Sequence, residues 1–544
     1  MRASGLISGV CLAALVAIAP LSATLAQPAS PHGDKAASAD DKGGDRGDKG
    51  GDHAKGHDGD RISPDDIATA PVHEIASRTH HTVTVAGQAI AYTATAGTLT
   101  IRDDEGKPIG SMFYVAYTAD HAGATHRPVT FFYNGGPGSS SMWLHMGSLG
   151  PMRIHTDSPQ ATRNAPFAFE PNEYSLLDKT DMVFIDAMGT GFSRPLGDTK
   201  LEKFWGVDPD LDAFTRAIKR YLTSANRWAS PKFLFGESYG TTRTAGLTYM
   251  LQEQGVQLNG ATILSSVLNY GRQQPGYDES YVGYVPSYAA TAWYHNLIPN
   301  RPADLTPFLA EVRQWAEGPY LAALAKGDAI SPQEADAVAK QLSAYTGLSV
   351  EFIKQCHLRV DLGRFRAELL RRQGLVIGRY DSRFTGYDPD EAGESPDHDP
   401  SDSGITGAFV SAFNSYVTND LDFHTDMVYR PTNYNRELHW DFTHAAPGQR
   451  FGKQASVDVA VDLAAAMREN PHLKLFSANG WYDLATPFFN TEYDIAHMGL
   501  PESIRSNIRF AYYPSGHMVY LNPEALKSLK ADLSRFYDDA TSGS

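Results

Sequence analysis

Cysteine is scarce in this chain of 544 residues, which contains only Cys11 and Cys356. Cys11 lies in an apolar segment close to the N-terminus, and without that segment the chain would hold a single thiol. A framework of intramolecular disulfides is therefore excluded, and so is a zinc site built on paired cysteines. Stability has to come from a large apolar core, for which a chain of this length is long enough.

Positive charge is scarce as well, since 47 Lys and Arg residues face 63 Asp and Glu residues, for a net charge of −16. An acidic chain repels phosphate backbones, so we exclude nonspecific binding to nucleic acid. The sequence also lacks a His-Glu-x-x-His motif and a dinucleotide-binding fingerprint. We expect no metal and no organic cofactor.

Long hydrophobic runs are confined to the N-terminus. Met1 and Arg2 precede an apolar stretch over residues 6–21, which is too short for a secure membrane span and ends at Ala23-Thr24-Leu25-Ala26. This pattern predicts a signal peptide over 1–26, cleaved after Ala26, with an uncleaved anchor as the alternative. An exported chain without disulfides is typical of a bacterial periplasmic or secreted protein, with no stable membrane insertion after processing.

Apolar residues are nearly missing from 27–66, where Gly, Asp and Lys alternate. Such a composition cannot bury a core, so it predicts a disordered linker. His32, His53 and His57 lie among its aspartates. We interpret them as part of a solvated tail in place of a weak metal site, because no tight ligand spacing is present.

Alternating strand and helix patterns fill most of the remaining chain. The strand patterns lie at 81–85, 89–92, 98–101, 111–117, 129–133, 181–186, 232–235, 261–266, 473–477 and 508–513. This order predicts an α/β sheet that is mostly parallel, with antiparallel strands before residue 120. Over 271–440 helical segments such as 307–326 and 332–345 take over. We expect a helical cap there, inserted between two core parts, 67–270 and 441–544.

A Gly-x-Ser-x-Gly pentapeptide, Gly236-Glu237-Ser238-Tyr239-Gly240, is the most informative motif. It follows the apolar run 232–235 and opens a helix-compatible stretch over 241–252, which is the order of a nucleophile elbow. Small residues on both sides of the serine let the backbone turn sharply and expose the hydroxyl. Ser238 is therefore the predicted nucleophile, which needs a base and an orienting acid.

Candidates for both partners follow downstream, in loops just past predicted strands. Asp483 comes after the run 473–477, and His517 comes after the run 508–513. Open α/β sheets build their sites at the carboxyl ends of strands, and the order Ser, Asp, His is that of α/β-hydrolases. We predict His517 as general base and acid, with Asp483 as the residue that orients it. Asp494 is the competing acid, but it lies in a helix-like segment.

A second glycine-rich segment, Asn134-Gly135-Gly136-Pro137-Gly138-Ser139-Ser140-Ser141, follows the strand pattern at 129–133. Glycines allow the close backbone approach that an oxyanion hole requires. The backbone N–H groups of Gly136 and Tyr239 are the predicted oxyanion donors. A phosphate-binding loop is the rival interpretation, but no Gly-Lys-Ser/Thr follows the glycines.

Together these motifs resemble those of the serine carboxypeptidases, peptidase family S10. The matching segments, in the family's order over 110–535, are Asn134 to Ser140, Gly189-Thr190-Gly191-Phe192-Ser193, Gly236 to Gly240, the loop of Gly480 and Asp483, and Gly516-His517-Met518. The resemblance implies an α/β-hydrolase fold with an inserted cap. It also implies removal of C-terminal residues from peptides through an acyl-enzyme.

The resemblance further implies a grip on the substrate's terminal carboxylate, with Asn134 as a side-chain donor and Glu237 as half of a carboxyl pair. Two positions differ from the family: Phe132 stands where tryptophan is usual, and Ser148 stands where the second glutamate is expected. Two carboxyl groups that share a proton favour acid pH. With Ser148 as a neutral donor, we expect activity to peak less sharply in acid.

The sequence thus predicts a serine carboxypeptidase acting on peptides with a free C-terminus. An esterase or an acyltransferase on the same scaffold is the alternative, because a triad and an oxyanion hole serve all three reactions. The departures at Phe132 and Ser148 keep this alternative open. Side-chain preference and oligomeric state are not encoded in any motif.

Overall fold

The computed structural model describes residues 67–120, 123, 126–274, 276–433, 439–449 and 451–542. The predicted signal peptide over 1–26 and the predicted linker over 27–66 lie outside the described residues, so both stay predictions. Within the described ranges, no helix combines the length and the apolar character that crossing a bilayer requires.

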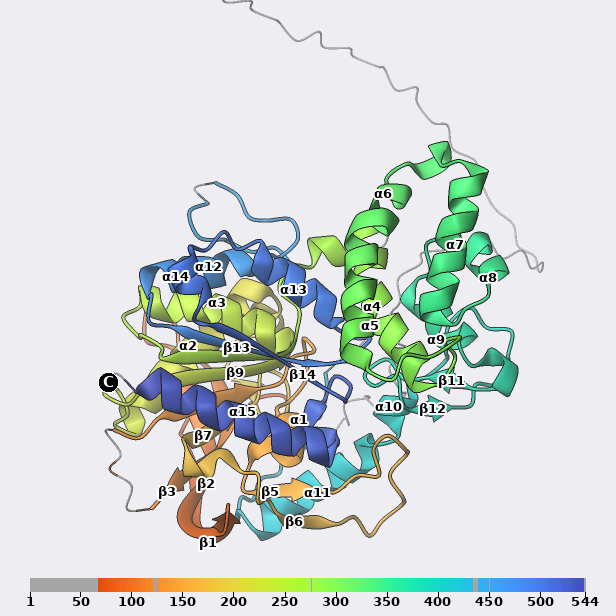
Figure 1. Cartoon of the computed structure of the whole chain (residues 1–544). Coiled ribbons are helices and arrows are strands. Elements are labelled where there is room, and N and C mark those ends of the chain that lie inside the picture. Colours follow the sequence, from red (N-terminus) through yellow and green to blue (C-terminus); the bar gives the residue numbers. More distant parts are fainter. Residues whose placement is uncertain are drawn as a thin grey trace, which may run out of the picture. The chain divides into compact units, whose positions relative to one another are not determined.

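A ten-stranded sheet forms the centre of the fold (Figure 1). Its strands lie in the order β1-β2-β3-β7-β4-β9-β10-β13-β14, and β8 pairs with β3. The pairs from β1 to β7 are antiparallel, whereas β7, β4, β9, β10, β13 and β14 form a parallel block. The strands are β1 (Ala76–Val85), β2 (Gln88–Arg102), β3 (Pro108–Ala119), β4 (Val129–Tyr133), β7 (Asp181–Ile185), β8 (Arg194–Pro195), β9 (Lys232–Ser238), β10 (Gly260–Ser266), β13 (Lys474–Gly480) and β14 (Ile508–Tyr513).

This sheet confirms the predicted α/β class with a mostly parallel sheet, in the arrangement of an α/β-hydrolase. Two predicted strands, 89–92 and 98–101, are parts of the single strand β2. The chain stays extended between them because both neighbours supply hydrogen bonds: Ala94 pairs with Thr79 of β1 and with Tyr117 of β3. Two smaller sheets pair β5 (Met152–Ile154) with β6 (Phe169–Pro171) and β11 (Val376–Ile377) with β12 (Thr385–Gly386).

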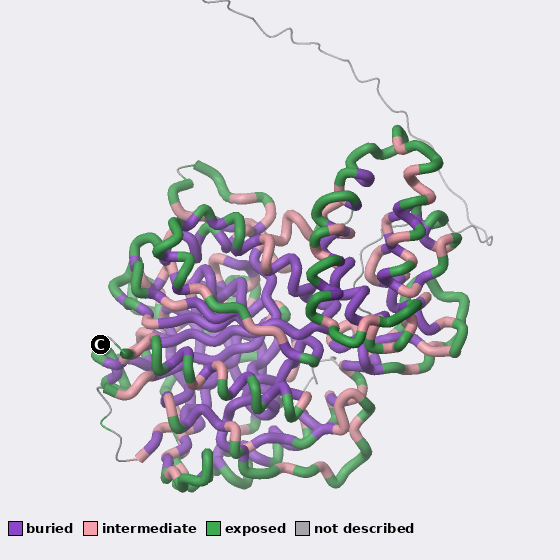
Figure 2. The backbone as a smooth tube through the Cα atoms, viewed as in Figure 1, coloured by how far each residue is buried: buried purple, intermediate pink, exposed green. Residues whose placement is uncertain are grey.

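Helices cover both faces of the main sheet (Figure 1). Helices α2, α3 and α12 belong to the apolar cluster on one face, and α1 and α15 belong to the cluster on the other. Figure 2 shows that the buried backbone is concentrated along the strands between these layers. The helices of this part are α1 (Met142–Leu144), α2 (Val207–Ser224), α3 (Tyr239–Glu253), α12 (Ala460–Glu469), α13 (Phe488–Ala496), α14 (Glu502–Arg505) and α15 (Pro523–Thr541).

The predicted cap segment, 271–440, contains a helical region with an apolar cluster of its own. That cluster also takes in Trp481, Tyr482 and Leu484 from the loop after β13, and Phe488 from the start of α13. The cap helices are α4 (Asp278–Tyr294), α5 (Leu305–Trp315), α6 (Leu321–Leu324), α7 (Pro332–Thr346), α8 (Val350–Gln355) and α9 (Leu362–Glu368). Two later helices are α10 (Pro400–Ser403) and α11 (Thr406–Asn419), of which α11 packs on α1 in the core.

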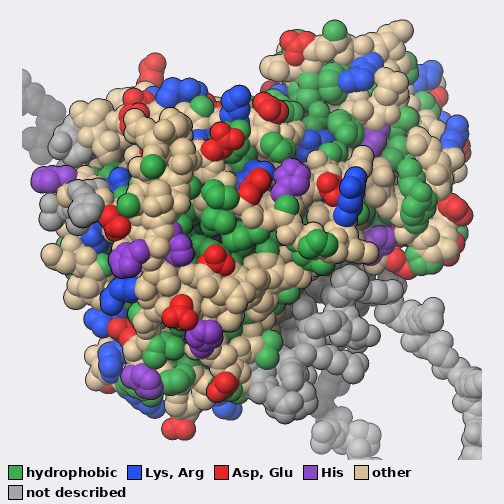
Figure 3. Space-filling view, turned by 90° about the horizontal axis from the view of Figure 1, so that it is seen from below, with side chains coloured by type: hydrophobic (Ala, Val, Ile, Leu, Met, Phe, Trp, Pro, Cys, Tyr) green, Lys and Arg blue, Asp and Glu red, His purple; other side chains and the backbone are tan. Residues whose placement is uncertain are grey.

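The surface seen in Figure 3 mixes charges of both signs. Hydrophobic side chains gather near the centre of this face, between acidic and basic ones. On the described part of this face, neither acidic nor basic side chains form an extended patch.

His444 joins α2 and α12 through two carboxylates. Its Nδ1 lies 2.7 Å from Asp208 Oδ1, and its Nε2 lies 2.9 Å from Asp462 Oδ2. Burial lowers the pKa of His444, but hydrogen bonds to the two carboxylates outweigh burial and raise it to about 9. The buried imidazolium therefore bridges the first turns of both helices.

We expect His444→Gln to destabilise the fold at neutral pH. At alkaline pH the same substitution should have little effect on stability. Because the folded pKa of about 9 exceeds the ordinary 6.5, the stabilisation by His444 is fully present below pH 6.5 and is lost as pH rises through about 9. A shift of this size corresponds to on the order of 3 kcal/mol. Thermal unfolding at both ends of this range measures it, with His424→Gln at an exposed position as the control. A loss of melting temperature that is the same at both ends would contradict the charge-based account.

Candidate functional site

Ser238 lies at the turn between β9 and α3, in a strained backbone conformation. Its φ is 61° and its ψ is −132°, a combination that L-residues rarely adopt. Glycines make the turn possible, because a Cβ on Gly236 would lie 2.0 Å from the Gly240 carbonyl oxygen. A Cβ on Gly240 would lie 2.8 Å from the Tyr133 carbonyl oxygen. The structure thus forms the strand–turn–helix that the motif predicts, with the half-buried serine at its apex.

His517 and Asp483 meet at the carboxyl edge of the parallel strands. Asp483 Oδ2 lies 2.8 Å from His517 Nδ1, and both side chains are buried. Strand β9 ends at Ser238, β13 ends at Gly480 and β14 ends at Tyr513. Since these strands are parallel and lie in the order β9-β10-β13-β14, all three predicted residues occupy the same edge of the sheet.

The carboxylate of Asp483 is fixed by its own turn. Its Oδ1 accepts the N–H groups of Ala485 at 2.8 Å and of Thr486 at 3.0 Å. Its Oδ2 accepts the Thr486 hydroxyl at 2.7 Å, and that hydroxyl also lies 3.1 Å from His517 Nδ1. Sequence reasoning missed Thr486, although an Asp followed by Thr at the third position is a signal for a turn closed by the aspartate side chain.

Asp494, the competing acid, lies in α13 and has other partners. Its Oδ1 lies 3.3 Å from Arg272 Nη1, and its Oδ2 accepts the Asn269 N–H at 3.3 Å. Burial raises the pKa of Asp494 to about 7, although Arg272 opposes the rise. The geometry therefore favours Asp483 as the partner of His517.

Opposing effects set the pKa of His517. Burial lowers it, but the charge and the hydrogen bond of Asp483 raise it above its ordinary value, and Glu237 adds to the rise. With Nδ1 occupied by Asp483, the other ring nitrogen, Nε2, is the one left to exchange a proton with a reacting group.

Two backbone segments converge at the elbow. Gly135 packs so closely on the start of α3 that a Cβ there would lie 2.3 Å from Tyr239 N. Gly136 follows with a φ of 111°, which favours glycine. The Tyr239 N–H is in the first turn of α3, where amides have no partner within the helix. The two predicted oxyanion donors, Gly136 and Tyr239, therefore come from adjacent segments.

Arg243 of α3 holds these segments together. Its Nη1 donates to the Asn134 carbonyl oxygen at 2.6 Å, and its Nε donates to Asp210 Oδ2 of α2 at 2.7 Å. The side chain is buried, and the Phe214 ring centroid lies 4.2 Å from its guanidinium carbon. Loss of either charged partner would leave a buried charge uncompensated, which typically costs about 3–5 kcal/mol.

The predicted carboxylate grip is present in part. Asn134 Oδ1 accepts the Leu144 N–H at 2.8 Å, which orients the side-chain amide. Burial raises the pKa of Glu237 to about 7. The expectation that Ser148 acts as a neutral donor in the site is wrong, because its hydroxyl donates to the Leu144 carbonyl oxygen in the preceding turn of η2 (His145–Leu149).

Tyr520, which sequence reasoning also missed, fills the space beside Glu237. Its ring packs on Gly147, where a Cβ would lie 2.6 Å from a ring carbon, and its hydroxyl lies close to Glu237 and Asn134. Among the described residues, neither the Tyr520 hydroxyl nor Glu237 Oε2 has a hydrogen-bond partner, and both are buried. The two groups lie beside each other without a well-formed hydrogen bond between them, so a ligand that reaches this space can supply one to each.

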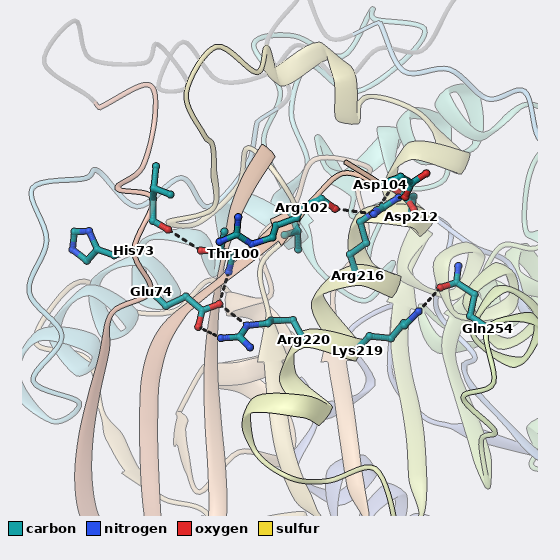
Figure 4. A pocket seen from close by; sticks show the side chains of 12 residues that line it. His73, Glu74, Thr100, Arg102, Asp104, Asp212, Arg216, Lys219, Arg220 and Gln254 are labelled. Atoms are coloured by element: carbon teal, nitrogen blue, oxygen red, sulfur yellow. Dashed lines mark hydrogen bonds and ion pairs between the residues drawn. The ribbon is translucent and has the colours of Figure 1, made fainter. Parts of the chain in front are cut away.

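A surface hollow of about 860 Å³ lies elsewhere, against β2 and α2 (Figure 4). Arginine side chains that line this hollow form ion pairs with neighbouring carboxylates. Arg216 pairs with Asp104 and Asp212, and Arg220 pairs with Glu74 at 2.7 Å. The residues that line it include none of the triad candidates, so it is not the candidate active site.

We expect Asp483→Asn to bring the pKa of His517 below its ordinary value. The substitution removes the main charge that raises this pKa, while burial still lowers it. Imidazole resonances followed through a pH titration by NMR measure the change, with Asp494→Asn as the matched control. A pKa of His517 that stays raised in Asp483→Asn would show that another group sets it.

Several known proteins are similar to parts of this chain. The pheromone-processing carboxypeptidase KEX1 of Yarrowia lipolytica is 29% identical over 181 residues, which cover 32% of this chain and 26% of that protein. Serine carboxypeptidase-like 36 of Arabidopsis thaliana is 32% identical over 88 residues, which cover 16% of this chain and 17% of that protein. The matched part of the chain thus spans 26% or less of these two relatives.

Among solved structures, a proline iminopeptidase of Mycobacterium smegmatis is 14% identical, with a TM-score of 0.36. The alignment covers 82% of this chain and 98% of that one. A likeness this remote carries no argument, and the fold class rests on the sheet described above.

A family model gives the last comparison. Residues 86–310 match the model described as serine carboxypeptidase. This range includes the glycine-rich segment at Asn134 and the elbow at Ser238. This match covers less than half of the 544 residues, and over it the chain is similar to the serine carboxypeptidases, peptidase S10.

Proposed function

We propose that the protein is a serine carboxypeptidase that releases the C-terminal residue of peptides through an acyl-enzyme. The observation that carries this proposal is the buried His517–Asp483 pair at the sheet edge where the strained elbow presents Ser238. The match of residues 86–310 to the serine carboxypeptidase model supports the same reaction class.

In the first half of the proposed reaction, Ser238 Oγ attacks the carbonyl carbon of the last peptide bond while His517 Nε2 accepts the hydroxyl proton. The N–H groups of Gly136 and Tyr239 stabilise the negative oxygen of the tetrahedral intermediate. The C–N bond then breaks, and His517 gives the proton to the departing amine.

In the second half, water takes the place of the amine. His517 accepts a proton from water, whose oxygen attacks the acyl carbon, and the bond to Ser238 Oγ breaks as the proton returns to the serine. Asp483 keeps the Nδ1–H of His517 in place and stabilises the imidazolium in both halves. The fixed turn around Asp483 supplies this geometry before any substrate binds.

Asn134 and Glu237 are the proposed contacts to the substrate's terminal carboxylate. The Asn134 amide is oriented by Leu144, and Glu237 offers a buried oxygen without a partner among the described residues. Below its pKa of about 7, Glu237 is neutral and its carboxyl O–H can donate to a carboxylate.

An esterase or acyltransferase is the second candidate. Ser148, which stands at the position expected for a second glutamate, uses its hydroxyl within its own helix, so it contributes no donor to the grip. A weaker grip favours substrates without a terminal carboxylate. For the carboxypeptidase, the proposed substrates are peptides with a free C-terminus. The enzyme is proposed to be exported.

We expect Ser238→Ala to abolish the release of the terminal amino acid from a blocked dipeptide. Loss of a triad nucleophile lowers turnover by about 10⁴-fold or more. Amino-acid release and labelling by a fluorophosphonate probe measure the loss, and Ser528→Ala at an exposed helix position is the control. Hydrolysis of the matching ester without any release from the peptide would support the esterase instead.

We also expect the KM for a peptide acid to rise as pH increases through about 7. Glu237 is neutral below this pKa and negative above it, so it repels the substrate carboxylate at higher pH. A rise of roughly 10-fold corresponds to ~1.4 kcal/mol of lost binding. Kinetics over this range in wild type and in Glu237→Gln, whose side chain stays neutral, measure it.

The C-terminally amidated peptide separates this effect from titration of His517. The amide has no carboxylate to repel, so its pH profile reports the catalytic groups alone. A profile for the peptide acid that is the same in wild type and Glu237→Gln would remove Glu237 from the grip.

A further inference from the structure

One segment between β11 and β12, residues 376–386, contacts the loops of both predicted partners of the nucleophile. We call it the strap. The Tyr380 carbonyl oxygen accepts the His517 N–H at 2.6 Å, and the Tyr380 and His517 ring centroids are 5.3 Å apart. The Arg379 carbonyl oxygen accepts the N–H of Leu484, the residue after Asp483, at 3.1 Å. The strap therefore belongs to the wall of the site.

The strap is held in place from its other side as well. Asp399 Oδ1 accepts the Arg379 N–H at 3.0 Å, and Ser401 Oγ accepts the Tyr380 N–H at 3.1 Å. Gly516 packs against it so tightly that a Cβ there would lie 2.5 Å from the Tyr380 carbonyl oxygen. The backbone that carries Arg379 is thus anchored before a substrate arrives.

Arg379 is a half-buried cation that forms no ion pair among the described residues, although the charges of Asp399 and Asp483 act on it. Its guanidinium carbon lies 5.6 Å from the Tyr380 ring centroid, and its side chain forms no hydrogen bond or ion pair there. Arg383, four residues later, shows the contrast: it pairs with Asp381 at 2.6 Å and donates to the Pro514 carbonyl oxygen at 2.8 Å.

This difference distinguishes a structural arginine from one that is available to a ligand. The charge of Arg379 lowers the pKa of His517, and the charge of Asp483 raises the pKa of Arg379, so the guanidinium lies near both groups. A cation beside the imidazole opposes its protonation, and a partly buried guanidinium without a partner is itself unfavourable. An anion bound to Arg379 would offset its effect on the imidazole and would pair the guanidinium. The planar guanidinium can donate two parallel hydrogen bonds to a carboxylate.

The proposed reaction determines which anionic group of the substrate lies near His517 and the strap. His517 Nε2 has to protonate the departing nitrogen, so that nitrogen lies next to the imidazole. In a peptide substrate the terminal carboxylate is two covalent bonds beyond this nitrogen. The carboxylate of the leaving residue therefore lies close to His517, whose ring the strap contacts through Tyr380.

We propose that Arg379 binds the α-carboxylate of the substrate's C-terminal residue. This inference rests on the proposed function. Asn134 and Glu237 supply uncharged donors to the same group, whereas Arg379 supplies the positive charge. A charged contact from the strap compensates for the carboxyl pair that Ser148 leaves incomplete.

The test compares a blocked dipeptide acid with its C-terminal amide in wild type, Arg379→Gln and Arg379→Lys. We expect Arg379→Gln to lower kcat/KM for the acid by about 10- to 100-fold, mostly by raising KM. Loss of a charge-assisted hydrogen bond typically has an effect of this size. Turnover of the amide should change by less than about 3-fold, since it makes no such bond. Arg379→Lys should recover part of the loss. Arg372→Gln removes an exposed arginine seven positions earlier and is the control for net charge.

Three outcomes would overturn the proposal. Equal losses on acid and amide would mean that Arg379 acts on the fold or on His517 alone. An unchanged acid-to-amide ratio would remove Arg379 from substrate binding. A loss confined to dipeptides that end in Glu would assign Arg379 to a side-chain carboxylate.

Two further measurements keep this inference separate from the proposed function. Fluorophosphonate labelling of Ser238 in Arg379→Gln shows that the nucleophile is intact, and failure to label the wild type would count against the proposed function only. Calorimetric binding of the acid and the amide to Ser238→Ala, with and without Arg379→Gln, repeats the comparison without turnover. Acid binding that is insensitive to Arg379→Gln there would overturn the inference whatever reaction the enzyme catalyses.

Discussion

The buried guanidinium of Arg243 is the interaction on which the site depends. It joins α3, which starts at the elbow, to Asp210 of α2 and to the carbonyl of Asn134 after β4. This places the glycine-rich segment against the helix start closely enough that only glycine fits at position 135. The predicted nucleophile, the two predicted amide donors and the Asn134 side chain are thereby positioned around one salt bridge.

The predicted acid and base, Asp483 and His517, depend on a second junction, between core and cap. The loop that carries Asp483 contributes Trp481, Tyr482 and Leu484 to the apolar cluster of the cap. The strap, which reaches back from the cap region, contacts this loop and His517. Cap helices and catalytic loops therefore share one packed interior, so the cap does more than cover the site.

The buried polar groups of this protein fall into two classes, those that form ion pairs and those that do not. Arg243, Arg383 and His444 are buried with their carboxylate partners and hold elements together. Glu237 and Tyr520 lie beside each other, Arg379 lies on the strap, and none of the three forms an ion pair among the described residues. Because an unpartnered buried polar group is costly, these three are the groups that a ligand stabilises most.

Local patterns predicted much of the fold and part of the site. The strands at 129–133 and 508–513 were predicted with their observed bounds, because short apolar runs between turn residues have few other solutions. The elbow at Ser238 was predictable because its constraints lie within five residues. The continuity of β2 was not, since it comes from pairing with β1 and β3 on either side.

The sequence by itself determined the elbow, the alternation of strands and helices, and the order in which Ser238, Asp483 and His517 follow. These are properties of neighbouring residues, for which spacing and turn chemistry are sufficient. Only the tertiary structure decided between Asp483 and Asp494, removed Ser148 from the site and brought Arg379, Thr486 and Tyr520 to it. The reason is physical: Asp483 and His517 are 34 residues apart, and Arg243 bonds to a carbonyl 109 residues away, so no local pattern records which of these segments meet.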